Sequence, residues 1–331
     1  MLRPVRQVIL EQPGRFVNAD AAPPARQPNE ALVRVRRVGV CGTDLHAYAG
    51  EQPYFTYPRI LGHELGVEVV ESPARVDNGL KPGDRCAVEP YLSCGECRAC
   101  RLGKYNCCEH LRVLGVHTDG GMREYLAVPE DRLHKSGKLS LDQLALVETL
   151  GIGAHAVARS GLRAGEDVLV VGAGPVGLGV VQFACAAGGS VRVLETNPMR
   201  REFVARLGVE TLAAPDARLA DVVFDATGNP RAMAESVSRV AHGGRLVFVG
   251  LVQGSVALDD PLFHRREVTL YATRNSAHDF PRIIGMIEQG EIDTTPWITH
   301  RLPLAEVPAG FASAVRDPKC VKAMIEVSGN S

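Results

Sequence analysis

The first part of the chain, from Val5 to Val70, alternates short apolar and polar runs that are broken by turn residues. Residues 32–36 and 66–70 show the pattern typical of strands, and residues 86–88 and 125–128 continue it. Proline and glycine clusters between these runs, at residues 23–28 and 81–84, predict loops. We therefore predict an irregular, antiparallel β-rich domain.

The pattern changes after Leu139. Residues 141–158 are apolar with helical spacing, and from Asp167 onward strand and helix patterns alternate. Apolar runs predict strands of a parallel sheet at residues 167–171, 191–195, 222–225 and 245–250, with a helix at residues 175–187. Beyond about Tyr271 this rhythm ends, and residues 320–327 predict a closing strand, so the tail is expected to return to the first domain.

Composition narrows the class of protein. The chain has 331 residues, 45% of them hydrophobic, and 37 basic residues nearly balance 38 acidic ones. The length favours two globular domains. Because the charges nearly cancel, the chain offers no basic field for nucleic acid or an anionic membrane, and we expect a small-molecule ligand. Because no secretory leader pattern and no long apolar run is visible, we expect a cytoplasmic protein without membrane contact.

A glycine motif lies between the first parallel strand and its helix. Residues 172–177 read Gly-Ala-Gly-Pro-Val-Gly, which fits the dinucleotide-binding pattern G-x-G-x-x-G in its usual context. Glu195 ends the next strand, where an acid accepts hydrogen bonds from ribose hydroxyls and repels a 2′-phosphate. We therefore expect NAD, with NADP less favoured although Arg200 and Arg201 would weaken the repulsion.

Cysteine spacing predicts a metal-binding lobe at residues 92–110. Cys94, Cys97, Cys100 and Cys108 can surround one ion, and four thiolates without an open position favour structural zinc. Cys107 is the neighbour expected to point away, because adjacent side chains rarely both face inward.

A second, sparser set consists of Cys41, His63, Glu64 and Glu148. Each residue alone would be an ordinary structural histidine, free thiol or solvated acid. Their presence in one chain with a dinucleotide motif indicates a catalytic zinc with an open position, which polarises an alcohol oxygen.

Together, the segment Gly39–His46, the Gly-His-Glu at residues 62–64, the cysteine lobe and the glycine motif resemble the zinc-dependent medium-chain alcohol and polyol dehydrogenases. The resemblance implies a GroES-like catalytic domain at residues 1–149 and 273–331, interrupted by a Rossmann NAD-binding domain at residues 150–272. The expected fold class is thus α/β plus β, with a doubly wound parallel sheet inserted into the β-rich domain. Two zinc ions per chain are implied.

The resemblance also implies residue roles. Cys41, His63 and Glu64 hold the catalytic zinc, and Glu148 is an additional carboxylate that binds it directly or through water. Thr43 and His46 form a proton relay, and Asp44 orients His63. The implied catalytic residues are Thr43, His46, Glu64 and Glu148. The expected cofactor contacts are Gly172, Gly174, Pro175, Val176, Gly177, Glu195, Arg200, Thr227, Val249, Gly250, Arg274 and Asn275.

Several stretches further resemble the bacterial L-galactonate 5-dehydrogenases: residues 50–59, 115–121, 260–267, 274–275 and 299–301. The implied reaction is NAD-dependent oxidation of a sugar-acid secondary alcohol at C5, with Arg274, Arg123 or His117 as candidate partners of the substrate carboxylate. A polyol, inositol or L-threonine dehydrogenase shares every catalytic motif. A non-catalytic, zinc-stabilised nucleotide-binding protein and a zinc-free quinone reductase are the more distant alternatives. By analogy with the family we expect a homo-oligomer, a dimer or a tetramer.

Overall fold

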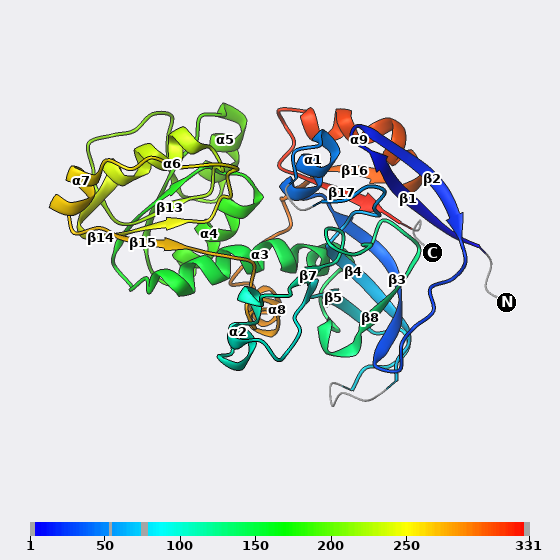
Figure 1. The fold of residues 1–331 in the computed structure, drawn as a ribbon. Coiled ribbons are helices and arrows are strands. Elements are labelled where there is room, and N and C mark those ends of the chain that lie inside the picture. Colours follow the sequence, from blue (N-terminus) through cyan, green and yellow to red (C-terminus); the bar gives the residue numbers. More distant parts are fainter. Residues whose placement is uncertain (1–3, 53–54, 74–78, 328–331) are drawn as a thin grey trace. The chain divides into compact units, whose positions relative to one another are not determined.

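The computed structural model describes residues 4–52, 55–73 and 79–327 (Figure 1). Pro53 and Tyr54, which belong to the stretch 50–59 singled out above, lie outside the described residues. The chain divides into two compact units. Unit 1 consists of Met1–Glu148 and Phe280–Ser331, and unit 2 is Thr149–Asp279.

Unit 1 is built around a seven-stranded sheet with the order β16-β17-β3-β4-β5-β9, in which β8 also pairs with β3. The sheet strands are β3 (Glu30–Gly39), β4 (Glu64–Glu71), β5 (Arg85–Val88), β8 (Tyr125–Pro129), β9 (Leu133–Lys135), β16 (Ile298–Pro303) and β17 (Lys322–Glu326). Two further strand pairs are β1 (Val5–Gln12) with β2 (Arg15–Ala21), and β6 (Tyr91–Leu92) with β7 (Arg112–Val113).

The helices of unit 1 are short. They are α1 (Gly42–Ala49), α2 (Arg98–Arg101), α8 (Phe280–Glu288), α9 (Val307–Arg316) and the 3-10 turns η1 (Tyr105–Cys107), η2 (Glu130–Arg132) and η4 (Leu304–Glu306). The long helix α3 (Leu141–Ser160) begins in unit 1 and continues into unit 2.

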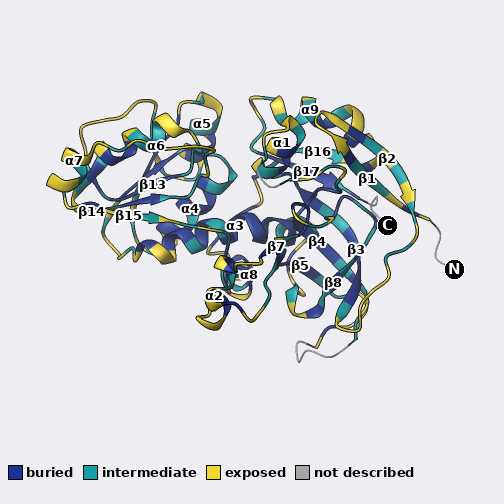
Figure 2. Cartoon of the chain, in the orientation of Figure 1, coloured by how far each residue is buried: buried dark blue, intermediate teal, exposed yellow. Residues whose placement is uncertain are grey.

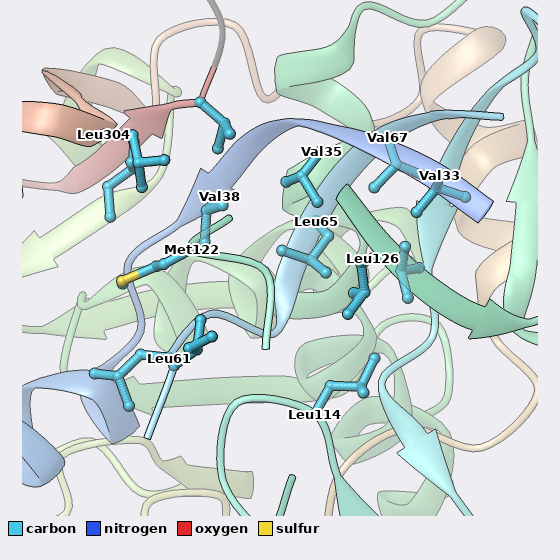
Figure 3. Close-up of a cluster of buried hydrophobic side chains, with 14 of the residues drawn as sticks. Val33, Val35, Val38, Leu61, Leu65, Val67, Leu114, Met122, Leu126 and Leu304 are labelled. Carbon is cyan, nitrogen blue, oxygen red and sulfur yellow. The ribbon is translucent and has the colours of Figure 1, made fainter. Parts of the chain in front are cut away.

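The core of unit 1 lies against the inner face of this sheet. Alternate residues of β3, such as Val33 and Val35, are fully buried and pack with Leu65 and Val67 of β4 (Figure 3). This is the consequence of strand geometry, in which successive side chains point to opposite faces. The packing fixes β3 against β4, and these two strands lead into the residues of the candidate site.

Unit 2 is a six-stranded parallel sheet with the order β12-β11-β10-β13-β14-β15. Its strands are β10 (Asp167–Val171), β11 (Ser190–Leu194), β12 (Glu210–Leu212), β13 (Ala220–Asp225), β14 (Val240–Phe248) and β15 (Thr269–Ala272). Its helical elements are α4 (Pro175–Ala186), α5 (Pro198–Arg206), α6 (Pro230–Ser236), η3 (Val237–Arg239) and α7 (Asp260–Arg265). Figure 2 shows buried residues along the central strands and exposed residues on the outer helices.

The predicted fold class, a β-rich GroES-like domain with an inserted Rossmann domain, is confirmed by this architecture. One pairing differs from the expected antiparallel pattern: β16 and β17 are parallel, because η4 and α9 form a crossover between them. The second boundary between the two compact units lies between Asp279 and Phe280, and the segment after β15 belongs to unit 2, where Thr273 N donates to Phe248 O (3.1 Å). The expected domain boundary at residues 272 and 273 stays a prediction. Within the described residues, no helix combines the length and apolarity needed to cross a bilayer.

Candidate metal centres and nucleotide site

Cys41, His63 and Glu64 come together in unit 1 at one end of the β3–β4 pair. One ligand atom from each residue lies within 4.8 Å of the other two. Cys41 follows β3 and caps α1, while His63 directly precedes β4 and Glu64 begins it, opposite Gly39 in the register. A Cβ atom on Gly39 would lie 2.0 Å from Oε2 of Glu64, so a glycine is required for this carboxylate to fit. The strand pairing therefore converts three distant positions into one cluster.

The chemistry of this cluster suits a divalent cation. His63 is buried, and its Nδ1 is 3.9 Å from Oδ1 of Asp44, too far for a hydrogen bond. Neither atom has a hydrogen-bond partner among the described residues. Burial opposes protonation of His63, but negative charge on Cys41, Asp44 and Glu148 raises the pKa of the imidazole well above its usual value. A buried set of thiol, imidazole and carboxylate that attracts positive charge is a donor set for zinc.

Asp44 lies beside His63, with its Oδ1 3.9 Å from Nδ1 of the imidazole, and its expected role in orienting His63 stays a prediction. Its Oδ2 accepts a hydrogen bond from the backbone N–H of Cys41 (2.9 Å), so the side chain caps helix α1. Burial raises the pKa of Asp44, and the nearby imidazole of His63 opposes this increase.

Glu148, on helix α3, lies beside the cluster but outside the set whose ligand atoms are all within 4.8 Å. The hydroxyl of Tyr91, on β6, donates a hydrogen bond to its Oε1. Both side chains are buried. Burial raises the pKa of Glu148, and the charge of His63 opposes the rise. The choice between direct and water-mediated metal binding by Glu148 remains a prediction.

Lys322 is a site residue that sequence reasoning missed. This lysine begins β17, is 1% exposed, and places Nζ 2.6 Å from Oε1 of Glu64. Burial disfavours its charge, but Glu64, Cys41 and Glu148 outweigh burial and raise its pKa. A charged residue directly before the apolar run Ala323–Ile325 was the available signal, since buried lysines occur almost only with a partner.

Helix α1 carries the two residues of the expected proton relay. Thr43 is half-buried near the start of the helix, and His46 is exposed three residues later. This spacing puts both side chains on one helix face. Nδ1 of His46 lies 3.6 Å from Oε2 of Glu51. The proton relay through these two residues stays a prediction.

The four predicted cysteine ligands form a second cluster, around α2 and η1. Their Sγ atoms are 3.4 Å to 4.0 Å apart along the pairs Cys97–Cys100, Cys94–Cys108, Cys97–Cys108 and Cys94–Cys100. Tetrahedral thiolates at Zn–S distances of about 2.3 Å would be separated by about 3.8 Å. Backbone N–H groups of Glu109 and Cys100 lower the pKa of Cys97 to about 6. Cys107 is exposed and lies outside the cluster.

In unit 2, the glycine motif connects β10 to α4. Gly172 has a φ of +93°, and Gly174 caps the helix with no atom near its missing Cβ. A Cβ on Gly177 would lie 2.0 Å from Gly172 O, so only glycine permits the close turn. Pro175 and Val176 begin the helix, whose free N–H groups form a site for a phosphate.

Glu195 follows β11 and is already engaged with the backbone of this region. Its Oε2 accepts from Ala173 N and its Oε1 from Asn197 N, both at 2.8 Å. Each carboxylate oxygen retains a further lone pair for a ribose hydroxyl. The side chain of Arg201 donates to Glu195 O (2.8 Å), whereas the backbone N–H of Arg200 donates to Oδ1 of Asn197, the residue that caps α5 (3.4 Å).

The other expected cofactor contacts follow neighbouring strands of the same sheet. Thr227 lies after β13, Val249 and Gly250 after β14, and Arg274 and Asn275 after β15. Because the strands are parallel, these positions share one sheet edge with the glycine motif, beside the order reversal at β10.

Asp225, at the end of β13, organises this edge and was not predicted. It is completely buried. Its carboxylate accepts from Thr227 Oγ1 (2.6 Å) and Ser236 Oγ (2.7 Å). An acid at the end of an apolar strand was the only signal in the sequence.

Two of the three residues expected to bind the substrate carboxylate form hydrogen bonds within unit 1. Arg123 is half-buried and donates to Oε1 of Gln7 (3.0 Å), and Nδ1 of His117 accepts from Val113 N (3.0 Å). Burial lowers the pKa of Arg123. Arg274 is exposed in unit 2.

Comparisons with known proteins agree with both units. Residues 27–138 match the family of the alcohol dehydrogenase GroES-like domain, and residues 175–289 match the zinc-binding dehydrogenase family. The chain is 42% identical to the L-galactonate-5-dehydrogenase of Escherichia coli K12, over 90% of this chain and 92% of that protein.

Two solved structures resemble the whole chain. A short chain alcohol dehydrogenase of Escherichia coli CFT073, complexed with NADH, has a TM-score of 0.90 and 28% identity, covering 98% of this chain and 99% of that one. A zinc-binding dehydrogenase of Sinorhizobium meliloti 1021, bound to NADP, has a TM-score of 0.90 and 28% identity, covering 98% and 100%.

Proposed function

Because the chain belongs to the zinc-dependent medium-chain alcohol dehydrogenases, we propose that it oxidises a secondary alcohol of a sugar acid, at C5 of an L-galactonate-like aldonate, with NAD as hydride acceptor. The observation that carries the proposal is the convergence of Cys41, His63 and Glu64, whose ligand atoms lie within 4.8 Å of one another. Bound zinc would lower the pKa of the substrate hydroxyl, and NAD would accept the hydride.

The remaining steps, metal binding and proton transfer, would be carried out by side chains of this protein. Cys41, His63 and Glu64 would hold the metal, with Glu148 as an additional carboxylate. Thr43 would take the hydroxyl proton and pass it to His46, whose exposure allows release to solvent. Four thiolates, those of Cys94, Cys97, Cys100 and Cys108, would bind a second, structural zinc.

The preference for NAD is proposed from Glu195. A carboxylate at the end of β11 accepts from ribose hydroxyls and repels the 2′-phosphate of NADP. Because the relative from Sinorhizobium meliloti binds NADP with the same fold, the fold alone does not fix this preference. We further propose that the enzyme works as a cytoplasmic homo-oligomer, a dimer or a tetramer.

The test is a screen for NAD reduction with L-galactonate, L-gulonate, sorbitol, inositols and L-threonine, repeated after treatment with a chelator. L-galactonate or a related aldonate should give the highest kcat/KM, and the chelator should abolish turnover. Full activity after complete loss of the Cys41 and His63 metal would contradict the zinc-dependent reaction. NAD binding without turnover of any alcohol would instead indicate a non-catalytic nucleotide-binding protein.

A further inference from the structure

Tyr91 and Glu148 are hydrogen-bonded to each other within unit 1. The phenol donates to Oε1 of the carboxylate, and the two residues are 3% and 4% exposed. The phenol is the donor in this contact, because a carboxylate oxygen accepts.

The backbone around Tyr91 is held on both sides. Tyr91 pairs with Val113 in the β6–β7 ladder, and Leu114 N donates to Pro90 O (3.1 Å). Upstream, Glu89 N donates to Arg132 O (2.8 Å). The carboxylate of Glu89 also binds the imidazole of His134, with Oε2 at 2.9 Å from Nε2. The phenol thus projects from a fixed strand.

The partner carboxylate is less constrained by its own backbone. Glu148 projects from helix α3, and its side chain has three rotatable bonds, so one backbone position permits several staggered arrangements of the carboxylate. A hydrogen bond from a rigid donor selects one of these arrangements. It engages Oε1 of a carboxylate that also interacts electrostatically with the buried His63.

We propose that Tyr91 is the positioning residue for Glu148, holding this carboxylate in the orientation that the metal site of Cys41, His63 and Glu64 requires. The proposal rests on the proposed function, in which Glu148 serves that site. Tyr91 itself would touch neither the substrate nor the cofactor. Outer partners of this kind typically change metal affinity or activity by 10-fold to 100-fold when they are removed.

The experiment is a double-mutant cycle of Tyr91→Phe and Glu148→Gln on the full-length, metal-loaded protein. Tyr91→Phe keeps the buried ring and removes only the hydroxyl. Two quantities are measured for each variant: metal affinity of the Cys41 and His63 site by competition with a chelator, and kcat and KM separately. Tyr125→Phe is the matched control. Its hydroxyl is also hydrogen-bonded, accepting from Nη2 of Arg34 (2.8 Å), but Tyr125 lies on β8 and is not hydrogen-bonded to Glu148 in the described structure.

Tyr91→Phe should weaken metal binding or lower kcat by about 10-fold or more, with a smaller change in KM. In the Glu148→Gln background it should have little additional effect, because the two residues act as one unit. Tyr125→Phe should leave both quantities within twofold of the unaltered protein.

Additive losses in the cycle would overturn the proposal, since Tyr91 would then act through packing alone. An unchanged Tyr91→Phe variant, or an unchanged Glu148→Gln variant, would overturn it as well. The metal competition needs no substrate, so a protein that reduces NAD with none of the tested alcohols would refute the proposed function and still report on Tyr91.

Discussion

Nζ of Lys322 lies 2.6 Å from Oε1 of Glu64, and both side chains are 1% exposed. The two residues are far apart in the sequence, on β17 and β4, with β3 between their strands. The ion pair therefore ties a predicted metal ligand to the C-terminal strand of unit 1.

The first prediction concerns this ion pair. Lys322→Met should lower the free energy of unfolding by about 3–5 kcal/mol, because it leaves the buried carboxylate of Glu64 without its cation. Denaturant unfolding measures the effect. Lys319→Met, at an exposed position of the same segment, should stay within about 0.5 kcal/mol of the unaltered protein. Equal stabilities of the two variants would argue against a structural role for the pair.

The second prediction concerns cofactor choice. Glu195→Ala should reduce the preference for NAD over NADP roughly 10-fold, equivalent to about 1.4 kcal/mol, because the acid that opposes a 2′-phosphate is gone. The measurement is the ratio of kcat/KM for the two cofactors. Glu202→Ala removes an exposed acid of α5 and should leave the ratio unchanged. If Glu195→Ala also leaves it unchanged, the acid plays no part in selection.

The third prediction concerns proton release through His46. His46→Ala should decrease kcat several-fold, most strongly at low pH, because the hydroxyl proton then lacks an acceptor near solvent. Added buffer bases should restore part of the lost rate. His242→Ala, which removes an exposed imidazole of unit 2, provides the control. A pH profile that coincides with that of the unaltered enzyme would exclude His46 from the relay.

The fourth prediction compares two adjacent cysteines. Cys108→Ser should remove the metal of the four-cysteine cluster and lower the unfolding midpoint, because a hydroxyl is a poor substitute for a thiolate. Cys107→Ser should retain the metal, since this side chain is exposed and lies outside the cluster. Metal content per chain distinguishes the variants. Loss of metal in both would mean that the two sulfurs exchange roles.

The parts of the fold that could be predicted are those with a local signal. The run Asp167–Val171 became β10 because a strand buried on both faces needs a continuous apolar sequence. The cysteine cluster forms within a segment of fifteen residues, so spacing alone indicates that its sulfurs can meet. Its neighbour Cys107 was expected to point away and is exposed.

The parts that could not be predicted depend on strand order. The contacts of Lys322 with Glu64 and of Tyr91 with Glu148 join segments that are distant in the sequence, and they depend on how β17 and α3 are placed in the fold. Each residue seemed ordinary in its own segment. The parallel pairing of β16 with β17 was also not predicted. The sequence between them has no regular alternation of strand and helix patterns, so it did not indicate which strand β17 would pair with or in which direction.

The two-residue ladder of β6 and β7 is the stem from which the four-cysteine loop projects, and its first residue is Tyr91. A loop exchanged between related enzymes at this stem would carry the Glu148 contact with it. A graft that keeps only the cysteine spacing and replaces Tyr91 would lose the hydrogen bond to Glu148. If Tyr91 positions Glu148 as proposed, the loop, its Tyr91 and Glu148 must be transferred together.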